Sequence, residues 1–486
     1  MNINKAVSFL DKNYKKILIP IILGIFLYSI FYGFPDSPSP WLDEGINIGI
    51  VKTWVETGVY SFRLSPEDYV SQLPWLITNN YPVLAPIALS FLLFGIGLWQ
   101  VKIVMIMFIF VFLFLTFFFV KDRYSEKSAY ISIALLVSFL PLYGNGLTGA
   151  NGELPGITFL LASFFFLNSE KIWKTLLAGF LIGICVATKP LFLPILFALA
   201  VEELYFAYKS KRVEWKRWLL LFVGMILPLF LWFKTLFPGE LTIGYLKETF
   251  DYYSNSQITN EGTLKANFLK FFTESTPIHF LLLVVFFCFF KIKSNSRKLS
   301  REEMIFWIFL VVDVVYFLKS PGWYRYFFPA HIIALIFAGP AFLYCKKYFD
   351  HKVYIKKILG FAFIFLLSVQ TFHLINSRGD ILYHNKSPRI FAEYLNKNIE
   401  EDKVLFMVDQ AAIGFLVQHK NTYHNYRINS HLRVGKNLFK EFPYPDYIVA
   451  IYPEDNELLK DYLSELEENF EEVKREGKHI LYKIKD

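Results

Sequence analysis

Long apolar runs are the feature of this sequence that most limits how it can fold. Four of them are close to twenty residues long, at 17–34, 101–120, 218–237 and 358–375. A helical run of this length matches the hydrocarbon core of a bilayer. Hydrophobic residues make up 55% of the chain and charged residues only 19%, which is unlike a soluble globular domain. The sequence therefore predicts an α-helical protein that crosses a membrane several times.

The N-terminal segment and the cysteines fit this class. Residues 5–16 are basic and precede the first apolar run without a small-residue cleavage site, so we expect an uncleaved first helix. The three cysteines lie far apart and imply neither a disulfide framework nor a thiolate metal site. The net charge of +8 comes mainly from short loops between apolar runs, which is typical of topology signals and not of nucleic-acid binding.

The distribution of Lys and Arg predicts the orientation of the chain. With a cytoplasmic N-terminus, the N-terminal segment and alternate loops hold 24 Lys and Arg, and the opposite, longer loops hold only 8. Basic residues mark cytoplasmic loops, so the second set of loops faces outward. Residues 82–97 must then be re-entrant or interfacial, because a crossing there would reverse every later loop. About eleven transmembrane helices in the plasma membrane result, with the C-terminal segment outside.

A sharp change in composition divides the chain into a transmembrane domain, residues 1–375, and an extracytoplasmic domain, residues 376–486. The second domain is charged and carries a helical, acidic segment at 456–472. Its strand-like runs cover residues 403–409, 446–452 and 479–484. We expect a small soluble α/β fold. It has no phosphate loop and no nucleophile motif, so acceptor recognition or a packing cap over the outer face is its predicted role.

The first outer loop carries two adjacent acids, Asp43 and Glu44. Three prolines before them prevent helix formation, and residues 46–60 after them have apolar side chains at helical spacing. We expect this helix to lie flat on the membrane surface. The two carboxylates then occupy its first turn, where they could simply cap the helix. Acids at the lip of a membrane cavity are costly to desolvate, however, which makes them candidates for function.

Three more charged residues in the outer loops are candidates for the same site. Glu153 is the only charge in a Gly-rich loop, and with Asp43 it could supply the two acids that general acid/base catalysis requires. Lys189 lies at the tip of a helical hairpin, and Arg325 lies in an aromatic loop beside Tyr326. Each cation could merely snorkel to lipid headgroups. Alternatively the cations bind an anion, because Arg pairs with phosphate oxygens bidentately and Lys acts as a point charge.

Other outer residues allow several roles. The long loop at 239–276 is either a lid over the acceptor or a surface amphipathic helix. His279, His331 and His373 lie near outer helix ends but without metal-ligand spacing, which does not favour a metal cluster. Asp313 is a carboxylate inside an apolar run, and we expect it to pair with a donor or to line the cavity.

In these residues the sequence resembles the GT-C superfamily of glycosyltransferases, specifically the branch with protein O-mannosyltransferases and the aminoarabinose transferase of lipid A. The resemblance covers nearly the whole chain. Its motifs are Asp43-Glu44, Tyr81-Pro82-Val83-Leu84 at the re-entrant helix, Glu153, residues 179–189 ending in Thr-Lys, and Arg325-Tyr326. The family usually has a basic residue and two prolines where this chain has Asn80-Tyr81-Pro82-Val83, and often Asp where Glu153 stands.

The resemblance implies a hexosyl- or pentosyltransferase that moves a sugar from a polyprenyl-phosphate donor to a protein, lipid or cell-surface glycan outside the membrane. It implies that Asp43 is the catalytic base and Glu153 a second acid. It also implies that Lys189 and Arg325, with Tyr326, contact the donor phosphate. A single displacement predicts inversion at the anomeric carbon.

The cofactor and the class of protein leave alternatives. Glu44 and Glu153 could orient the acceptor or hold a divalent cation. A transporter or flippase is the main rival, but such proteins usually show repeated halves and short loops, whereas charge here gathers in long outer loops and a soluble tail. A polysaccharide ligase or polymerase that uses pyrophosphate-linked glycans is the nearer rival. The sugar and the acceptor are not specified by the sequence.

Overall fold

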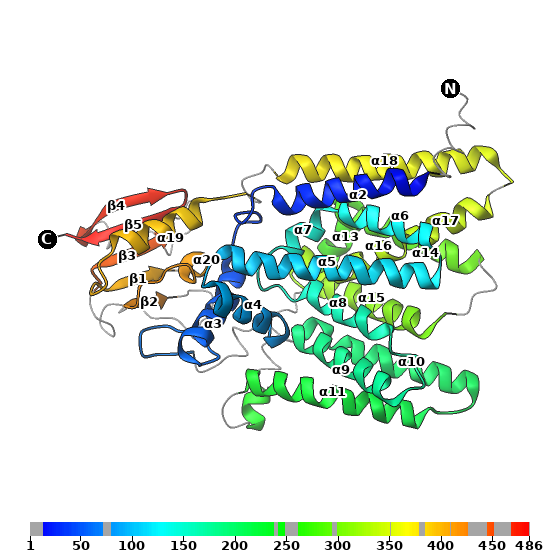
Figure 1. Ribbon diagram of the computed structural model, residues 1–486, viewed down its shortest axis with the longest axis horizontal. Coiled ribbons are helices and arrows are strands. Elements are labelled where there is room, and N and C mark those ends of the chain that lie inside the picture. The colour runs from blue at the N-terminus through cyan, green and yellow to red at the C-terminus, as the bar shows by residue number, and fades with distance from the viewer. Residues whose placement is uncertain are drawn as a thin grey trace.

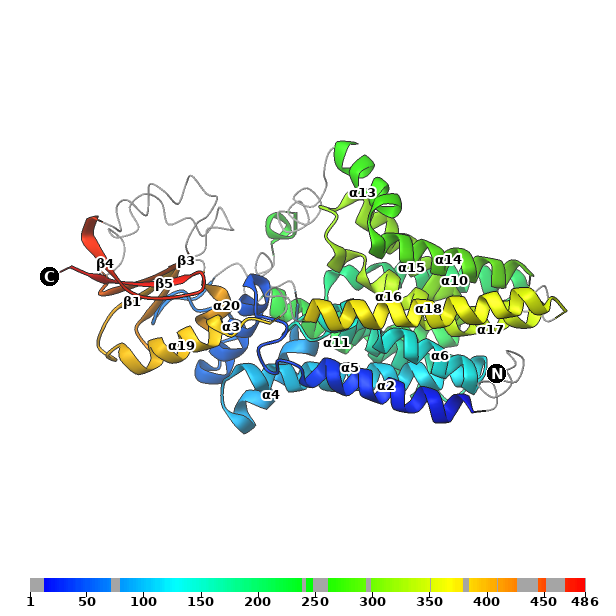
Figure 2. The ribbon, with the colours of Figure 1, turned by 90° about the horizontal axis from the view of Figure 1, so that it is seen from above.

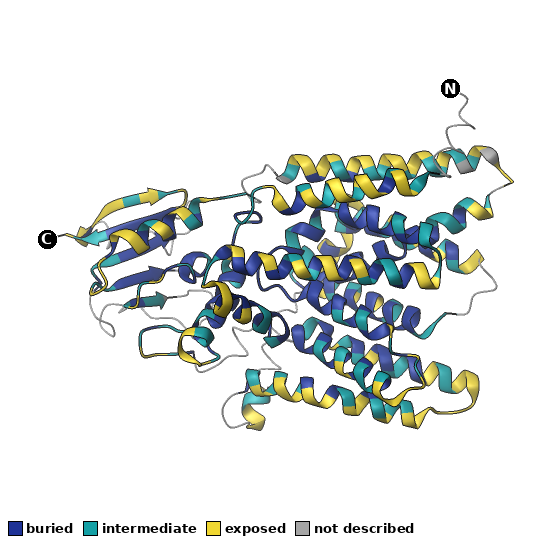
Figure 3. Ribbon diagram, viewed as in Figure 1, coloured by how far each residue is buried: buried dark blue, intermediate teal, exposed yellow. Residues whose placement is uncertain are grey.

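The computed structural model shows a bundle of long helices with a small α/β domain at one end (Figure 1). It describes residues 13–70, 79–237, 242–247, 261–293, 299–349, 351–378, 384–408, 410–425, 445–451 and 468–485. Figure 3 shows that the helices at the edge of the bundle turn exposed faces outward and that its interior is buried. On α18 (Val353–Arg378) the exposed side chains include Phe361, Phe365 and Phe372, as expected for a face in contact with lipid tails.

Six described helical segments are long and apolar enough to cross a membrane, and together they include all four apolar runs of the sequence. These segments are α2 (Tyr14–Phe31), α5 (Leu98–Arg123), Pro190–Ser210 with α10 (Pro194–Ser210), α11 (Trp215–Leu236), α14 (Ser275–Lys293) and α18. Two bent pairs raise the number to eight if each pair is one span. The pairs are α6 (Glu126–Val137) with α7 (Leu140–Gly146), and α16 (Phe328–Ile336) with α17 (Ala338–Tyr348).

Three further helices pack among these candidates: α8 (Glu153–Phe164), α9 (Ile172–Thr188) and α15 (Arg301–Lys319). α8 and α9 are apolar but shorter than the six candidates. α9 and α11 approach each other closely because both carry glycine where they meet. A Cβ on Gly179 of α9 would lie 2.2 Å from the carbonyl oxygen of Leu221, and one on Gly224 of α11 would lie 2.3 Å from that of Leu176. This contact fixes the position of α9, the helix that ends directly before Lys189.

The loops separate by charge along the bundle axis. The basic loops at 121–127, 171–174 and 209–217 lie at the end far from the α/β domain, and the outer loops lie beside that domain (Figure 1). This agrees with the alternation of inner and outer loops that the charge distribution predicts.

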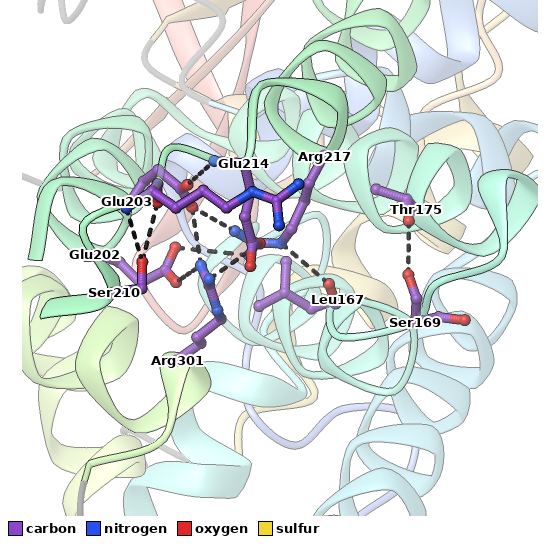
Figure 4. A network of polar contacts seen from close by, with 10 residues as sticks. Leu167, Ser169, Thr175, Glu202, Glu203, Ser210, Glu214, Arg217 and Arg301 are labelled. Atoms are coloured by element: carbon purple, nitrogen blue, oxygen red, sulfur yellow. Dashed lines mark hydrogen bonds and ion pairs between the residues drawn. The ribbon is translucent and has the colours of Figure 1, made fainter. Parts of the chain in front are cut away.

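A buried network of ion pairs ties helices together at the basic end (Figure 4). Glu203 of α10 accepts hydrogen bonds from Arg217 of α11 at 2.6 Å and from Arg301 of α15 at 2.8 Å. Glu202 accepts another from Arg301 at 2.5 Å. Each carboxylate would be costly to bury without these partners. The network therefore fixes α10, α11 and α15 relative to one another.

Two helices of the first outer loop, α3 (Leu42–Thr57) and α4 (Tyr81–Phe94), lie between the bundle and the α/β domain (Figures 1 and 2). α4 has 14 residues, about 21 Å of helix, which is less than the roughly 30 Å of a bilayer core. This length agrees with the predicted re-entrant or interfacial segment.

The helix predicted at 46–60 is α3, which begins earlier, at Leu42, and ends before Gly58. It packs against α4 on one side and against α20 (Ala411–Gly414) of the α/β domain on another, so its apolar residues contact protein as well. A Cβ on Gly45 would lie 2.0 Å from the carbonyl oxygen of Ala411, so the two backbones are in direct contact. An apolar helix face can be buried by a protein domain as well as by lipid, and the sequence pattern does not distinguish the two.

The described residues of the C-terminal domain form a five-stranded sheet in the order β2-β1-β3-β5-β4. Its strands are β1 (Leu405–Val408), β2 (Thr422–Asn425), β3 (Tyr447–Ile451), β4 (Phe470–Glu476) and β5 (His479–Ile484). β1 is parallel to β2 and β3, and β5 is antiparallel to β3 and β4. The helix α19 (Ser387–Asn398) packs on the sheet through Phe391 and Leu395. The predicted α/β fold is thus confirmed, with strands at all three predicted runs.

Two predictions about outer segments need comment. The acidic helix predicted at 456–472 is wrong at its C-terminal end, because residues 470–472 belong to β4; residues 456–467 lie outside the described part. Pairing with β5 across a turn at Gly477, whose φ is +58°, outweighs the helical preference of the glutamates. In the loop at 239–276, residues 261–273 form α13 (Glu261–Thr273), and the aromatic residues at 250–253 are not described.

Candidate active site

Four outer segments bring the predicted site residues together. Arg325, in the short helix η3 (Tyr324–Tyr326), donates from Nη1 to Oδ2 of Asp43 in the first turn of α3, 282 residues away in sequence. Lys189, directly after α9, donates from Nζ to Oε1 of Glu153 at the start of α8 at 2.5 Å. The structure therefore contains two acid–base pairs, each joining segments distant in sequence.

The two pairs lie close enough to act on each other electrostatically. Burial has the largest single effect and disfavours the charged form of Arg325, but Asp43, Tyr326 and Glu153 together outweigh it, and the pKa of Arg325 is raised. Burial also raises the pKa of Tyr326, against the effect of Arg325 and together with the charges of Asp43 and Glu153. Tyr326 is therefore a neutral hydrogen-bond donor at neutral pH. Asp43, Glu153, Lys189, Arg325 and Tyr326 therefore form one cluster of interacting polar groups, which does not include Glu44.

Aromatic rings surround the guanidinium of Arg325. Its carbon lies 4.5 Å from the ring centre of Trp323, 5.0 Å from that of Trp41 and 5.2 Å from that of Tyr326. Cation–π contacts of this kind hold the planar group in a fixed orientation. Arg325 Nε is buried and donates no hydrogen bond in the structure, so one donor of the fork is unused. Trp41 and Trp323 are themselves 38% and 52% exposed, which leaves flat apolar surface for a ligand beside the cation.

The two acids differ in access to solvent. The side chain of Asp43 is 25% exposed, whereas that of Glu153 is fully buried. Glu153 Oε2 has no hydrogen-bond partner, and the same is true of Oδ1 of the neighbouring Asp313. The other oxygen of Asp313 accepts a hydrogen bond at 3.0 Å from the backbone N–H of Ala330 in α16, so Asp313 pairs with a donor as predicted. Only Asp43 is placed to meet a molecule that arrives from solvent.

Glu44 faces away from Asp43, although the two are adjacent in sequence. It is fully buried, accepts from the N–H of Gly149 and forms an ion pair at 3.3 Å with Lys102 of α5. Burial raises the pKa of Glu44, and Lys102 opposes the shift. Lys102 also donates to two backbone carbonyls at 2.9 Å, those of Pro38 and Leu147. The Glu44–Lys102 pair therefore links the first and second outer loops to α5.

Asn79 and Asn80, which precede α4, were not predicted as part of the site. Asn79 Oδ1 accepts from the N–H of Gly152 at 2.7 Å, and the N–H of Asn80 donates to the carbonyl oxygen of Thr188 at 3.1 Å. Gly152 and Thr188 directly precede Glu153 and Lys189. The two asparagines therefore set the spacing of the second acid–base pair. Asparagine is common in loops, and nothing in its sequence position marks this role.

Replacing Asn79 with Ala is expected to lower the free energy of unfolding by about 1–3 kcal/mol, because the N–H of Gly152 would stay buried without an acceptor. The measurement is the shift in unfolding midpoint of the purified protein in detergent. Asn398→Ala is the matched control, since Asn398 is exposed and bonds only within its own helix. Equal effects of the two substitutions would contradict the assigned role of Asn79.

The predicted histidines form a hydrogen-bonded pair under η3. His279 Nδ1 and His331 Nε2 lie 2.9 Å apart, and His331 Nδ1 lies 3.2 Å from the hydroxyl of Tyr324, which precedes Arg325. His373 is elsewhere and contacts Ser377. Within the described part of the chain, no three His, Cys, Asp or Glu side chains are arranged to hold a metal ion. The lysine pairing of Glu44 and of Glu153 is also unlike a site for a divalent cation.

Comparisons with known proteins identify the fold. Residues 82–233 match the family described as dolichyl-phosphate-mannose-protein mannosyltransferase. No match was found among curated proteins. The structure is similar to that of ArnT from Cupriavidus metallidurans bound to undecaprenyl phosphate, with a TM-score of 0.62 and 13% sequence identity, over 97% of this chain and 98% of that one.

The structure is also similar to the oligosaccharyltransferase AglB from Archaeoglobus fulgidus, solved with an inhibitory peptide and a dolichol-phosphate. The TM-score is 0.53 and the identity 10%, over 90% of this chain and 70% of that one. At such low identities the likeness concerns the fold. The chain is a multi-pass membrane protein, and its fold is the GT-C-like fold that the sequence predicted.

Proposed function

We propose that this protein is an inverting glycosyltransferase that moves a sugar from a polyprenyl-phosphate donor to an acceptor at the outer face of the plasma membrane. The observation that carries the proposal is the pairing of Asp43 with Arg325 beside the pair of Glu153 and Lys189. A base for the acceptor hydroxyl and cations for the leaving phosphate are thereby held in one cluster. The donor class is supported by the similar structures, one bound to undecaprenyl phosphate and one to a dolichol-phosphate.

The cations suit a phosphate that leaves. When the bond between the anomeric carbon and the phosphate oxygen breaks, its electron pair stays with the phosphate, which needs no proton to depart as a monoester. Arg325 still has Nε–H to donate, and its aromatic cage keeps the fork oriented. Lys189, held by Glu153, adds a second positive charge. Cations fixed in a poorly hydrated site stabilise developing negative charge more strongly than water does.

Asp43 suits the acceptor side. Its carboxylate would accept the proton of the acceptor hydroxyl while the acceptor oxygen bonds to the anomeric carbon, on the face opposite the phosphate. One Asp43 oxygen is engaged by Arg325 in this structure. A donor phosphate that takes over the hydrogen bonds of Arg325 would release this oxygen. We therefore propose that the donor binds before the acceptor is activated.

Glu44 and the C-terminal domain would act indirectly. The bonds of Glu44 to Lys102 and Gly149 support a positioning role for Glu44 in place of a direct catalytic role beside Asp43. The backbone contact between α20 and α3 supports a packing role for the C-terminal domain. Acceptor recognition is its second proposed role.

The test is a turnover assay with purified protein and a polyprenyl-phosphate monosaccharide. Incubation with envelope extracts as the source of acceptor should release polyprenyl phosphate and label one class of protein, lipid or glycan. Consumption only of pyrophosphate-linked glycans would identify a ligase or polymerase instead. Solute flux in proteoliposomes without donor consumption would identify a transporter. Either result would contradict the proposal.

Arg325→Lys is expected to raise the KM for the donor roughly 30-fold, which corresponds to about 2 kcal/mol for a charge-assisted hydrogen bond. An ammonium group cannot bind Asp43, Tyr326 and a phosphate in the planar geometry of a guanidinium. Steady-state kinetics at varied donor concentration measure the effect. Arg212→Lys, an exposed position at the opposite end of the bundle, is the control. A donor KM that stays unchanged in Arg325→Lys would rule out Arg325 as a phosphate contact.

A further inference from the structure

A cavity of about 390 Å³ lies between α3 and the C-terminal domain, apart from the acid–base pairs. This volume is within the range of small-molecule binding sites, about 300–1,000 Å³. α3 contributes one wall, the segment after it contributes Phe62 and Arg63, and residues 411–424 of the C-terminal domain contribute the rest. No part of the proposed transfer reaction uses this space.

The charged groups around the cavity are mainly basic. Lys52, Arg63 and Lys420 line it, whereas Glu56 is the single acid among its described lining residues. The Lys52 ammonium donates a hydrogen bond to the carbonyl oxygen of Val417, and an ammonium has three donors. The donors of Lys52 therefore exceed the acceptors that this bond supplies.

The basic groups repel one another. Burial lowers the pKa of Lys52, and the charge of Arg63 lowers it further, although Glu56 acts in the opposite direction. Burial likewise lowers the pKa of His424 to about 3, and the charges of Lys52 and Arg63 add to the shift. Three cations and the single carboxylate of Glu56 leave an excess of positive charge in a partly desolvated space, which an added negative charge would balance. An anion in the cavity would supply that charge.

The uncharged lining suits a carbohydrate. The hydroxyls of Thr53, Thr57 and Thr422 already donate to backbone carbonyls, but their oxygens can still accept hydrogen bonds from a sugar. The amide of Gln418 offers both a donor and an acceptor. The ring of Phe62 adds an apolar surface for the C–H face of a pyranose. Simple anion sites lack this combination.

The cavity lies close enough to Asp43 for one ligand to reach both. Lys52 follows Asp43 by nine residues on the same helix, a rise of about 14 Å. A short glycan can extend over this distance. We propose that the cavity is an acceptor subsite that binds a saccharide unit carrying a phosphate or carboxylate group. That the bound saccharide is the acceptor rests on the proposed glycosyltransferase function, whereas the binding of an anionic saccharide does not.

Calorimetric titration of the full-length protein in detergent tests the proposal, with glucose 6-phosphate, glucuronate, glucose and inorganic phosphate as probes. We expect the two anionic sugars to bind, and Lys52→Gln and Lys420→Gln each to weaken this binding at least tenfold. Lys420 is exposed, so its substitution keeps the test valid even if Lys52→Gln disturbs the fold. Lys171→Gln, at the basic end of the bundle, is the control and should bind as the unmodified protein does.

Several outcomes would overturn the inference. They are an absence of binding by both anionic sugars, equal binding by glucose, equal binding by inorganic phosphate alone, or binding that neither lysine substitution weakens. Failure of the proposed function is recognised separately. If Asp43→Asn and the unmodified protein bind glucose 6-phosphate equally while no donor is ever consumed, the saccharide site stands and the glycosyltransferase function falls.

Discussion

Replacing Asp43 with Asn is expected to lower kcat by about 10²- to 10⁴-fold, the range that a positioned general base contributes. Asparagine keeps the size and planarity of the side chain but cannot accept the acceptor proton. The KM for the donor should change little, because Asn still reaches Arg325 while the guanidinium keeps its aromatic cage. The measurement is steady-state turnover of purified protein with polyprenyl-phosphate sugar at saturating acceptor.

Two comparisons make this result specific to the base. Glu67→Gln removes an exposed carboxylate from the same outer loop and should leave kcat unchanged. The unfolding midpoint of Asp43→Asn should stay close to that of the unmodified protein, because Asp43 is partly exposed and loses one ion pair. If Asp43→Asn retains kcat within a few-fold, the base is another group, and the buried Glu153 becomes the next candidate.

The largest expected effect on stability is that of Lys102→Met, a loss of about 3–5 kcal/mol. Methionine fills the space of the alkyl chain, but the fully buried Glu44 would lose its cation, and the carbonyls of Pro38 and Leu147 would lose a donor. The unfolding midpoint and the denaturant dependence in detergent measure this change. Turnover should fall as well, since both outer loops that carry the acids are anchored by this lysine.

The double variant Glu44→Gln/Lys102→Met separates an unpaired charge from lost packing. Removing both charges should recover part of the stability, because no buried charge then lacks a partner. Lys15→Met breaks the exposed ion pair with Glu126 and should have little effect. A single variant Lys102→Met as stable as the unmodified protein would contradict the burial of Glu44.

The sequence predicted the bundle well because the bilayer imposes a simple rule on it. Apolar runs of about twenty residues form most of α2, α5, α11 and α18. The basic loops lie together at the end of the bundle far from the α/β domain, as the alternation of loop charge predicts. Local rules worked less well outside the membrane. β2 was missed because its four residues form a strand by pairing with β1, and this pairing is not visible in so short a segment.

The candidate site was predictable in part. The sequence predicted Asp43, Glu153, Lys189 and Arg325 on one side of the membrane, and the structure brings them into two contacting pairs. Grouping Glu44 with them overlooked helix geometry, because successive helical residues point about 100° apart and rarely face the same ligand. The partner of Glu44 had a signal in the sequence: Lys102 is the single charge inside the apolar run 101–120. A single cation in an apolar run requires an acidic partner, and that partner of Lys102 is Glu44.

The backbone contact between Gly45 and Ala411 has a mechanical consequence. The first turn of α3 is held by Lys102 of α5 on one side and by α20 on the other, so the helical bundle and the C-terminal domain together fix the orientation of Asp43. A chain that ends before the C-terminal domain would keep every residue of the two acid–base pairs. It would nevertheless lose the contact between α20 and α3, and the carboxylate of Asp43 would no longer be held in one orientation.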